Sequence, residues 1–333
     1  MRMPIAVLTL LAPVAFAQLE NAHVGLIDFY ALNGLDPNQL RAALSVRPGD
    51  KLLWPAVPNT IKEELIKATG RPYTHFSPVC CDKTGRWMLY IGFGAPPASE
   101  VPRPKPSASL TLPPELTALY DEFMAALPAS LKFASGQPED YSKGYSLASY
   151  PPMRAIQMRM REDALANEAL LLRVLLESAD DKQRIAASQL TGYTRQSPRQ
   201  IEALMEASRD ANATVRNNAT RALGVLAATP EFARQIPAAP FIEMLNSPVW
   251  SDRNKGLMLL TFHTRSRDPQ VLAAIRAKAL PALVEMAQWQ FAGHAAGPIR
   301  LLGRIAGIDE IELNNLADKG DAGPVISAVG KLK

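Results

Sequence analysis

A frame of small and branched aliphatic residues recurs in the second half of the chain and constrains the fold more than any other feature. The clearest copy, residues 210–224, reads Asp, then Val-Arg, then Ala, then Ala-Leu-Gly. Looser copies place Arg184 32 residues before Arg216 and Arg253 37 residues after it. A fourth copy, residues 291–305, has Leu-Leu-Gly but Ala295 at the arginine position. An apolar stretch with helical spacing precedes each copy, which predicts successive helix pairs; these stretches are residues 170–176, 201–207, 241–245 and 272–286.

The frame at residues 210–224 resembles the second helix of a HEAT repeat, and the resemblance extends over about residues 164–307. It implies that residues 151–333 form an all-α superhelical solenoid whose concave surface binds partner proteins. We expect structural roles for Arg184, Arg216 and Arg253, with Asp210 pairing with Arg216 to tie the turn to the helix. Pro281 predicts a kink or break in the last apolar helix. The alternative is a compact helical bundle without a superhelix.

The first seventeen residues have the pattern of a secretory signal peptide. A short basic start, with Arg2, precedes an apolar run, and Ala15-Phe16-Ala17 offers small residues to a signal peptidase. We expect cleavage after Ala17 and export to the periplasm or the medium. No other run is long and apolar enough to span a bilayer, so we expect no stable membrane insertion after cleavage. The alternative is a buried N-terminal helix or strand.

Residues 18–94 predict a small α+β domain with the order β-α-α-β-β. Residues 23–32 have strand composition, and Asp36-Pro37 has the pattern of a helix start. A second helix is expected from Asn59 or Thr60 to Gly70, and a hairpin over residues 74–93.

This order resembles a POTRA domain, a periplasmic module found beside outer-membrane assembly barrels. The residues that carry the resemblance are Ile27-Asp28-Phe29, Gly34-Leu35, Leu40, Leu44, Pro48-Gly49-Asp50 and the hairpin after Gly70. The chain departs from the usual setting, because only one such unit is visible and no barrel follows. The resemblance implies binding of extended peptides by strand addition at a sheet edge.

Residues 95–114 contain seven prolines, which predicts an extended, semi-rigid linker between two folding units. Residues 115–150 are expected to form a bridge, with a helix over 115–127 and a loop from Pro128 onward. The chain is therefore predicted to be multidomain.

The adjacent Cys80 and Cys81 cannot staple distant loops. We interpret them as two small buried residues on a strand; the alternatives are a vicinal redox pair and metal thiolates. Lys and Arg number 36 against 32 Asp and Glu, for a net charge of +4 that signal cleavage lowers to +3. This excess forms no basic stripe with interleaved aromatics, so we expect no nucleic-acid partner.

No motif predicts a catalytic, cofactor-binding or metal-binding residue. Residues 144–148 nearly match a nucleophile elbow around Ser146, but a polar loop precedes them and Pro151-Pro152 follows. Residues 92–94 resemble a dinucleotide loop, yet Pro96-Pro97 forbids the helix that should follow. The four histidines, His23, His75, His263 and His294, do not have metal-ligand spacing.

Trp250 and Trp289 lie at loop or helix-end positions of the repeats and are the candidate partner-binding residues, with core packing as the alternative. We therefore expect an exported, soluble scaffold that binds proteins through a HEAT-like surface. One alternative is an accessory factor in envelope or outer-membrane protein assembly. Another is an enzyme on a HEAT-like scaffold, because such stacks resemble those of some DNA-base glycosylases and bilin lyases.

Overall fold

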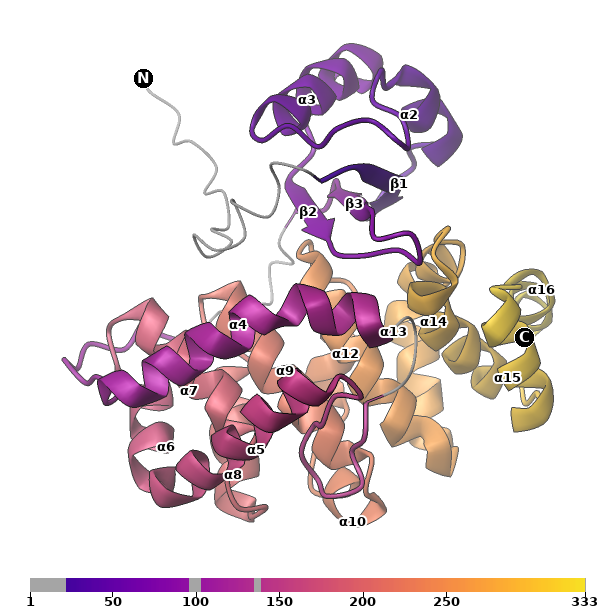
Figure 1. Cartoon of the computed structure of the whole chain (residues 1–333). Helices are drawn as coiled ribbons and strands as arrows, with labels where there is room; N and C mark the ends of the chain where they lie inside the picture. Colours follow the sequence, from indigo (N-terminus) through magenta and orange to yellow (C-terminus); the bar gives the residue numbers. More distant parts are fainter. Residues whose placement is uncertain (1–21, 96–102, 135–138, 333) are drawn as a thin grey trace. The chain divides into compact units, whose positions relative to one another are not determined.

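The structure, a computed structural model, describes residues 22–95, 103–134 and 139–332. The predicted signal peptide, residues 1–17, lies outside the described residues. The chain forms two compact units, of which the first takes residues 22–95 with the short segments 248–250 and 289–291. The remaining residues form the second unit, which is helical (Figure 1).

The first unit has the predicted strand–helix–helix–strand–strand order. Its strands form one sheet in the order β1-β3-β2, with β3 parallel to β1 and antiparallel to β2. The apolar core lies between this sheet and the two helices, and β3 is buried because it has a neighbour on each side. The elements are β1 (Val24–Tyr30), α2 (Pro37–Ala43), α3 (Ala56–Thr69), β2 (His75–Val79) and β3 (Trp87–Gly92).

The start and stop residues explain where the first two helices lie. Asp36 caps α2, because its carboxylate accepts a hydrogen bond from the Asn38 N–H at 2.8 Å and Pro37 follows at the first helical position. Gly70 ends α3 in the left-handed conformation, at φ +71°. α3 begins at Ala56, earlier than the predicted Asn59 or Thr60 cap, and no side chain caps it.

The prediction for the two cysteines was wrong. Cys80 and Cys81 are bonded to each other as a vicinal disulfide, and both are half-buried. They follow β2, which ends at Val79 rather than continuing through them. The turn begins there because the Asp82 carboxylate accepts hydrogen bonds from the N–H groups of Thr84 and Arg86, at 2.8 and 3.0 Å.

From α4 onward the described elements are helices. Among the described residues, no helix is both long and apolar enough to cross a bilayer. The helices are α4 (Pro114–Ala134), α5 (Pro151–Ala166), α6 (Glu168–Glu177), α7 (Asp181–Thr191), α8 (Pro198–Ala207), α9 (Ala213–Ala227), α10 (Pro230–Ala233), α11 (Ala239–Met244), α12 (Trp250–His263), the 3₁₀ turn η1 (Thr264–Ser266), α13 (Pro269–Ala287), α14 (Ala292–Ile305), α15 (Glu310–Lys319) and α16 (Gly323–Gly330).

The predicted helix pairs are α6–α7, α8–α9, α11–α12 and α13–α14. α6 packs on α7 and α8 on α9, while α6 also contacts α8 and α7 contacts α9, so two successive pairs stack side by side (Figure 1). Ala187 in α7 and Ala219 in α9 are fully buried, because small residues let the helices approach closely. α13 continues through Pro281, so the predicted break is absent there.

The linker prediction was wrong for residues 103–113, which belong to the helical unit; residues 96–102 lie outside the described residues. Arg103 N–H donates to the Arg209 carbonyl at 2.9 Å, and Ala108 forms an isolated parallel bridge with Ser178. The proline composition correctly predicts an extended backbone. The residues between the prolines can still form backbone hydrogen bonds with the ends of helices.

The helix predicted over residues 115–127 is longer than expected. α4 continues through Pro128 to Ala134, which shortens the predicted loop. A proline inside a helix removes one backbone hydrogen bond without always ending the helix, because neighbouring contacts can hold the axis in place. Leu116, Leu119 and Phe123 on α4 are buried.

Candidate functional site

The three repeat arginines make the same contact in successive pairs. Arg184 donates to the Ser178 carbonyl at 2.9 Å, Arg216 to the Asp210 carbonyl at 2.8 Å, and Arg253 to the Ser247 carbonyl at 2.6 Å. In each case the acceptor lies six residues earlier. Each arginine therefore holds the turn that precedes its own helix, which is the structural role expected for it.

The acidic partner of each arginine comes from further along the chain. Arg184 binds the Asp210 carboxylate at 2.9 Å, Arg216 binds Asp252 at 2.9 Å, and Arg253 binds Glu285 at 3.1 Å. We call these contacts the arginine ladder. Asp210 and Arg216 do pair and tie the turn to the helix, but Arg216 bonds to the Asp210 carbonyl and not to its carboxylate. The Asp210 carboxylate accepts instead from Arg184 and from Arg103, which is 2.8 Å away.

Trp250 and Trp289 are buried, with 7% and 5% of their surface exposed. Both belong to the first compact unit, where their rings lie 4.9 and 5.0 Å from the ring of Tyr90. The Trp289 indole N–H donates to the Phe29 carbonyl at 3.3 Å. In this arrangement both tryptophans pack in a core, and neither presents its ring as a surface anchor.

A second feature, absent from the sequence interpretation, is the folded segment of residues 139–149, which we call the strap. Asp140 and Leu147 exchange backbone hydrogen bonds at 2.9 and 3.0 Å, so the strap closes as a small loop. Gln196, in the turn after α7, donates to the Lys143 carbonyl at 2.7 Å. Gly144 has a φ of +73°, which residues with a side chain rarely adopt. These contacts fix the strap against the helical unit.

The strap brings Glu139 and Ser146 to Arg221 on α9. Arg221 forms an ion pair with the Glu139 carboxylate and donates to the Ser146 hydroxyl at 3.0 Å. The Tyr141 hydroxyl also donates to Glu139, at 3.1 Å. Lys255 on α12 and His294 on α14 lie close enough to be coupled electrostatically to this group. We call Glu139, Arg221, Lys255 and His294 the charged cluster.

Burial determines the charge states in the charged cluster. Desolvation would raise the pKa of Glu139, but the charge of Arg221 and hydrogen bonds from Ser146 and Tyr141 outweigh it and lower that pKa. Desolvation, reinforced by Arg221, lowers the pKa of Lys255 to about 8. Burial and then the charge of Lys255 lower the pKa of His294 to about 3. At pH 7 the charged cluster therefore holds two cations, one carboxylate and a neutral histidine.

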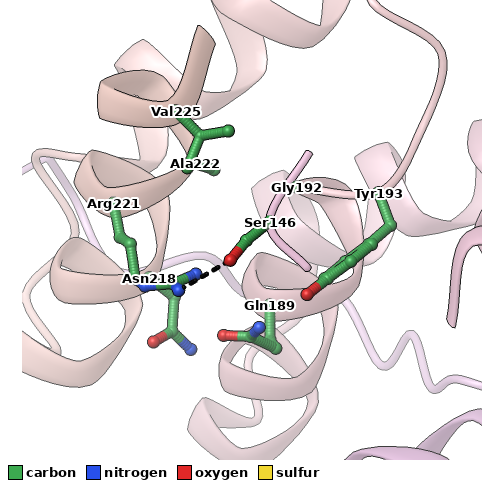
Figure 2. A pocket seen from close by; sticks show the side chains of 8 residues that line it. All are labelled: Ser146, Gln189, Gly192, Tyr193, Asn218, Arg221, Ala222 and Val225. Carbon is green, nitrogen blue, oxygen red and sulfur yellow. Dashed lines mark hydrogen bonds between the residues drawn. The ribbon is translucent and has the colours of Figure 1, made fainter. Parts of the chain in front are cut away.

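Arg221 and Ser146, joined by their hydrogen bond, both line a small cavity (Figure 2). The cavity is lined also by Gln189, Tyr193 and Asn218, and its volume is about 10 Å³. This is about the space of one water molecule, so the cavity has no room for an organic cofactor. The buried Tyr193 hydroxyl, at its edge, has no hydrogen-bond partner among the described residues.

Ser146 lies in the strap rather than on a strand-to-helix turn. Its hydroxyl accepts a hydrogen bond from Arg221, and an arginine is a cation that cannot take up the proton of a serine nucleophile. Within residues 22–95, 103–134 and 139–332, no three side chains of His, Cys, Asp or Glu lie together as metal ligands.

Alignment of the repeats on their arginines is the signal that could have revealed these residues. Asn218 in α9 and Lys255 in α12 each lie two positions after the arginine of their own repeat. Gln189 in α7 and Arg221 in α9 each lie five positions after it. Positions two and five lie about one turn apart on a helix and share a face. The polar residues at these positions line the cavity or belong to the charged cluster. A position that only packs in the interior would favour an apolar residue.

Replacing Lys255 with Met is expected to stabilise the protein below pH 8, with an advantage that shrinks between pH 8 and about 10. The native state loses the lysine proton near pH 8, while the unfolded chain keeps it up to pH 10.5. The wild type therefore gains stability as pH rises, by roughly 1 kcal/mol per pH unit. Above about pH 10, tyrosines such as Tyr141, whose pKa desolvation raises to about 12, act in the opposite direction.

Urea unfolding of both proteins at a series of pH values measures this difference. The charged groups that act on Lys255 are Arg221 and Glu139, and the substitution leaves both in place. A difference between the two proteins that stays constant from pH 7 to pH 10 would contradict the assignment.

Comparison of the chain with protein-family models and with curated proteins found no match.

Proposed function

We propose that this protein is an exported scaffold that binds a partner protein on the face of the helix pairs that carries the charged cluster. The observation that supports this most directly is the presence of two cations, Arg221 on α9 and Lys255 on α12, close to the single carboxylate of Glu139 in the strap. Partly desolvated charges are costly to keep without a partner, and proteins place them where binding uses them.

Two further observations support a macromolecular partner. The cavity beside Arg221 is too small for a cofactor or a metabolite, so a ligand would have to approach over the surface. The stacked helix pairs and the arginine ladder agree with the resemblance to HEAT repeats, and such stacks commonly bind proteins. The leader at residues 1–17 supports action outside the cytoplasm.

A photo-crosslinking residue placed in intact cells tests the proposal. Met258 on α12 stands five positions after Arg253, as Arg221 stands after Arg216, and is therefore the reporting position. Glu202 is the control position, because it is exposed on α8, the first helix of the pair α8–α9. We expect one identified protein to crosslink at Met258 and not at Glu202. Equal labelling at both positions, or none at Met258, would contradict the proposal.

A third crosslinking position tests the alternative, an accessory role in outer-membrane protein assembly. β2 has one neighbour in the described sheet, so its other edge is the kind of edge to which an extended peptide adds. Crosslinks from Ser77 on β2 to an outer-membrane protein, without any at Met258, would favour the alternative. N-terminal sequencing of the same exported protein should begin at Gln18.

A further inference from the structure

Lys255 differs from the other cation of the charged cluster in lacking a direct partner. Arg221 has both an ion pair with Glu139 and a hydrogen bond to Ser146. The Lys255 amine makes no hydrogen bond and no ion pair with any residue that the structure describes, and its side chain is half-buried. It lies near enough to Glu139 to feel that charge without contacting it.

The charges around Lys255 leave an excess of one positive charge. Arg221 and Glu139 neutralise each other, and His294 is uncharged at neutral pH because its pKa is about 3. Lys255 remains protonated at pH 7 and is partly removed from water. An isolated charge in such a place is unfavourable until an opposite charge approaches it.

We infer that a carboxylate from an acidic side chain of the partner protein pairs with Lys255, beside the Glu139–Arg221 ion pair. The inference rests on the proposed function, because it names the chemistry that the same face recognises. A carboxylate brings the single negative charge that neutralises the cluster. A phosphate group would bring about two, and the surplus would be repelled by Glu139. Lysine also suits the role, because its ammonium is a compact charge with three donors.

The test uses the purified full-length chain with its lysines lightly ¹³C-methylated, so that NMR follows the titration of each amine. The probes are seven-residue Gly/Ser peptides with a central Asp-Asp, the same peptides with Asn-Asn, and inorganic phosphate. We expect the acidic peptide to raise the pKa of Lys255 from about 8 toward the ordinary value of lysine, because an opposite charge favours the protonated amine. The Asn-Asn peptide should leave it unchanged.

Two variants assign the effect to this residue. Lys255→Met should weaken binding of the acidic peptide roughly tenfold or more, whereas Lys255→Arg should retain most of it. Lys182→Met, at an exposed position near the start of α7, is the matched control and should leave binding unchanged. Folding of each variant is checked by circular dichroism before binding is measured.

Two outcomes would overturn the inference. One is a response to phosphate at lower concentration than to the acidic peptide, which would identify a phosphate site. The other is a Lys255 resonance that neither probe moves. The cellular crosslink at Met258 separates this inference from the proposed function. If the crosslink persists in Lys255→Met, the carboxylate pairing is refuted, while the proposal that the protein is a scaffold stands.

Discussion

Replacing Asp210 with Asn is expected to lower the free energy of unfolding of the helical unit by about 3–5 kcal/mol, since it leaves buried arginines without their anion. Asp210, Arg184 and Arg103 expose 1%, 1% and 6% of their surfaces, so water cannot replace the lost charge. Hydrogen bonds from Arg184, the Asn212 N–H and Arg103 outweigh desolvation and hold the pKa of Asp210 below its ordinary value. The loss is a large share of the 5–15 kcal/mol by which domains are typically stable.

Asp181→Asn is the matched control. Asp181 also pairs with Arg184, at 2.9 Å, but 43% of its side chain is exposed. An exposed pair contributes about 1 kcal/mol or less, so this variant should unfold close to the wild type. Urea unfolding followed by circular dichroism measures both variants. Equal losses for Asp210→Asn and Asp181→Asn would show that burial of the pair does not matter.

Gly256→Val is expected to lower the free energy of unfolding by about 1–3 kcal/mol, because α11 and α12 leave no room for a side chain at this position. A Cβ at Gly256 would lie 2.9 Å from the Met244 Cβ and 3.0 Å from the Phe241 carbonyl oxygen. One of these neighbours is backbone, so relief requires movement of a helix rather than rotation of a side chain. Phe241 is fully buried and would move together with that helix.

Gly330→Val separates this steric effect from helix propensity. Gly330 lies at the end of α16, and a Cβ there would meet nothing within 4 Å. Because valine is a better helix former than glycine, this control should be neutral or slightly stabilising. Gly256→Ala should lie between the wild type and Gly256→Val. Thermal unfolding of the set gives the order, and a Gly256→Val variant as stable as Gly330→Val would refute the close contact.

Local sequence signals predicted the first unit well. Asp36-Pro37 marks the start of α2 and Gly70 the end of α3, because a capping carboxylate and a left-handed glycine act within a few residues of the chain. The pairing of Cys80 with Cys81 was only an alternative to two buried strand residues, because composition says only that free cysteines are commonly buried. The sheet order β1-β3-β2 was not predicted either, since it depends on which strands meet in space.

The helix pairs were predicted from their period, but their connections were not. A repeat arginine has a constant place in its helix, which the sequence displays; its acidic partner comes from the following part of the chain. Arg184 and Asp210 are 26 residues apart, and Arg216 and Asp252 are 36 apart. No local rule selects among several acids at such distances. The same difficulty hides Arg103, which reaches Asp210 from 107 residues away.

The charged cluster shows why the candidate site was missed. Glu139 and Arg221 are 82 residues apart and lie in segments with different local signals, a loop and a helix. The sequence offered Trp250 and Trp289 as candidates because tryptophan is over-represented at binding hot spots, with core packing as the other role, and the choice between the two depends on the fold. In the structure both pack against Tyr90. Polar residues at equivalent repeat positions, such as Asn218 and Lys255, are the better guide, because they interrupt an expected apolar pattern.

The arginine ladder runs in one direction along the helical unit, with each arginine bonded backward to its own turn and forward to an acid of later sequence. A boundary drawn between α7 and α8 therefore separates the buried Arg184 from its counter-ion, and one between α9 and α11 separates the half-buried Arg216 from its own. Fraying from either terminus must uncover such a charge before the next segment melts, which couples neighbouring segments into one cooperative block. Domain trimming would have to end outside the span from Arg184 to Glu285.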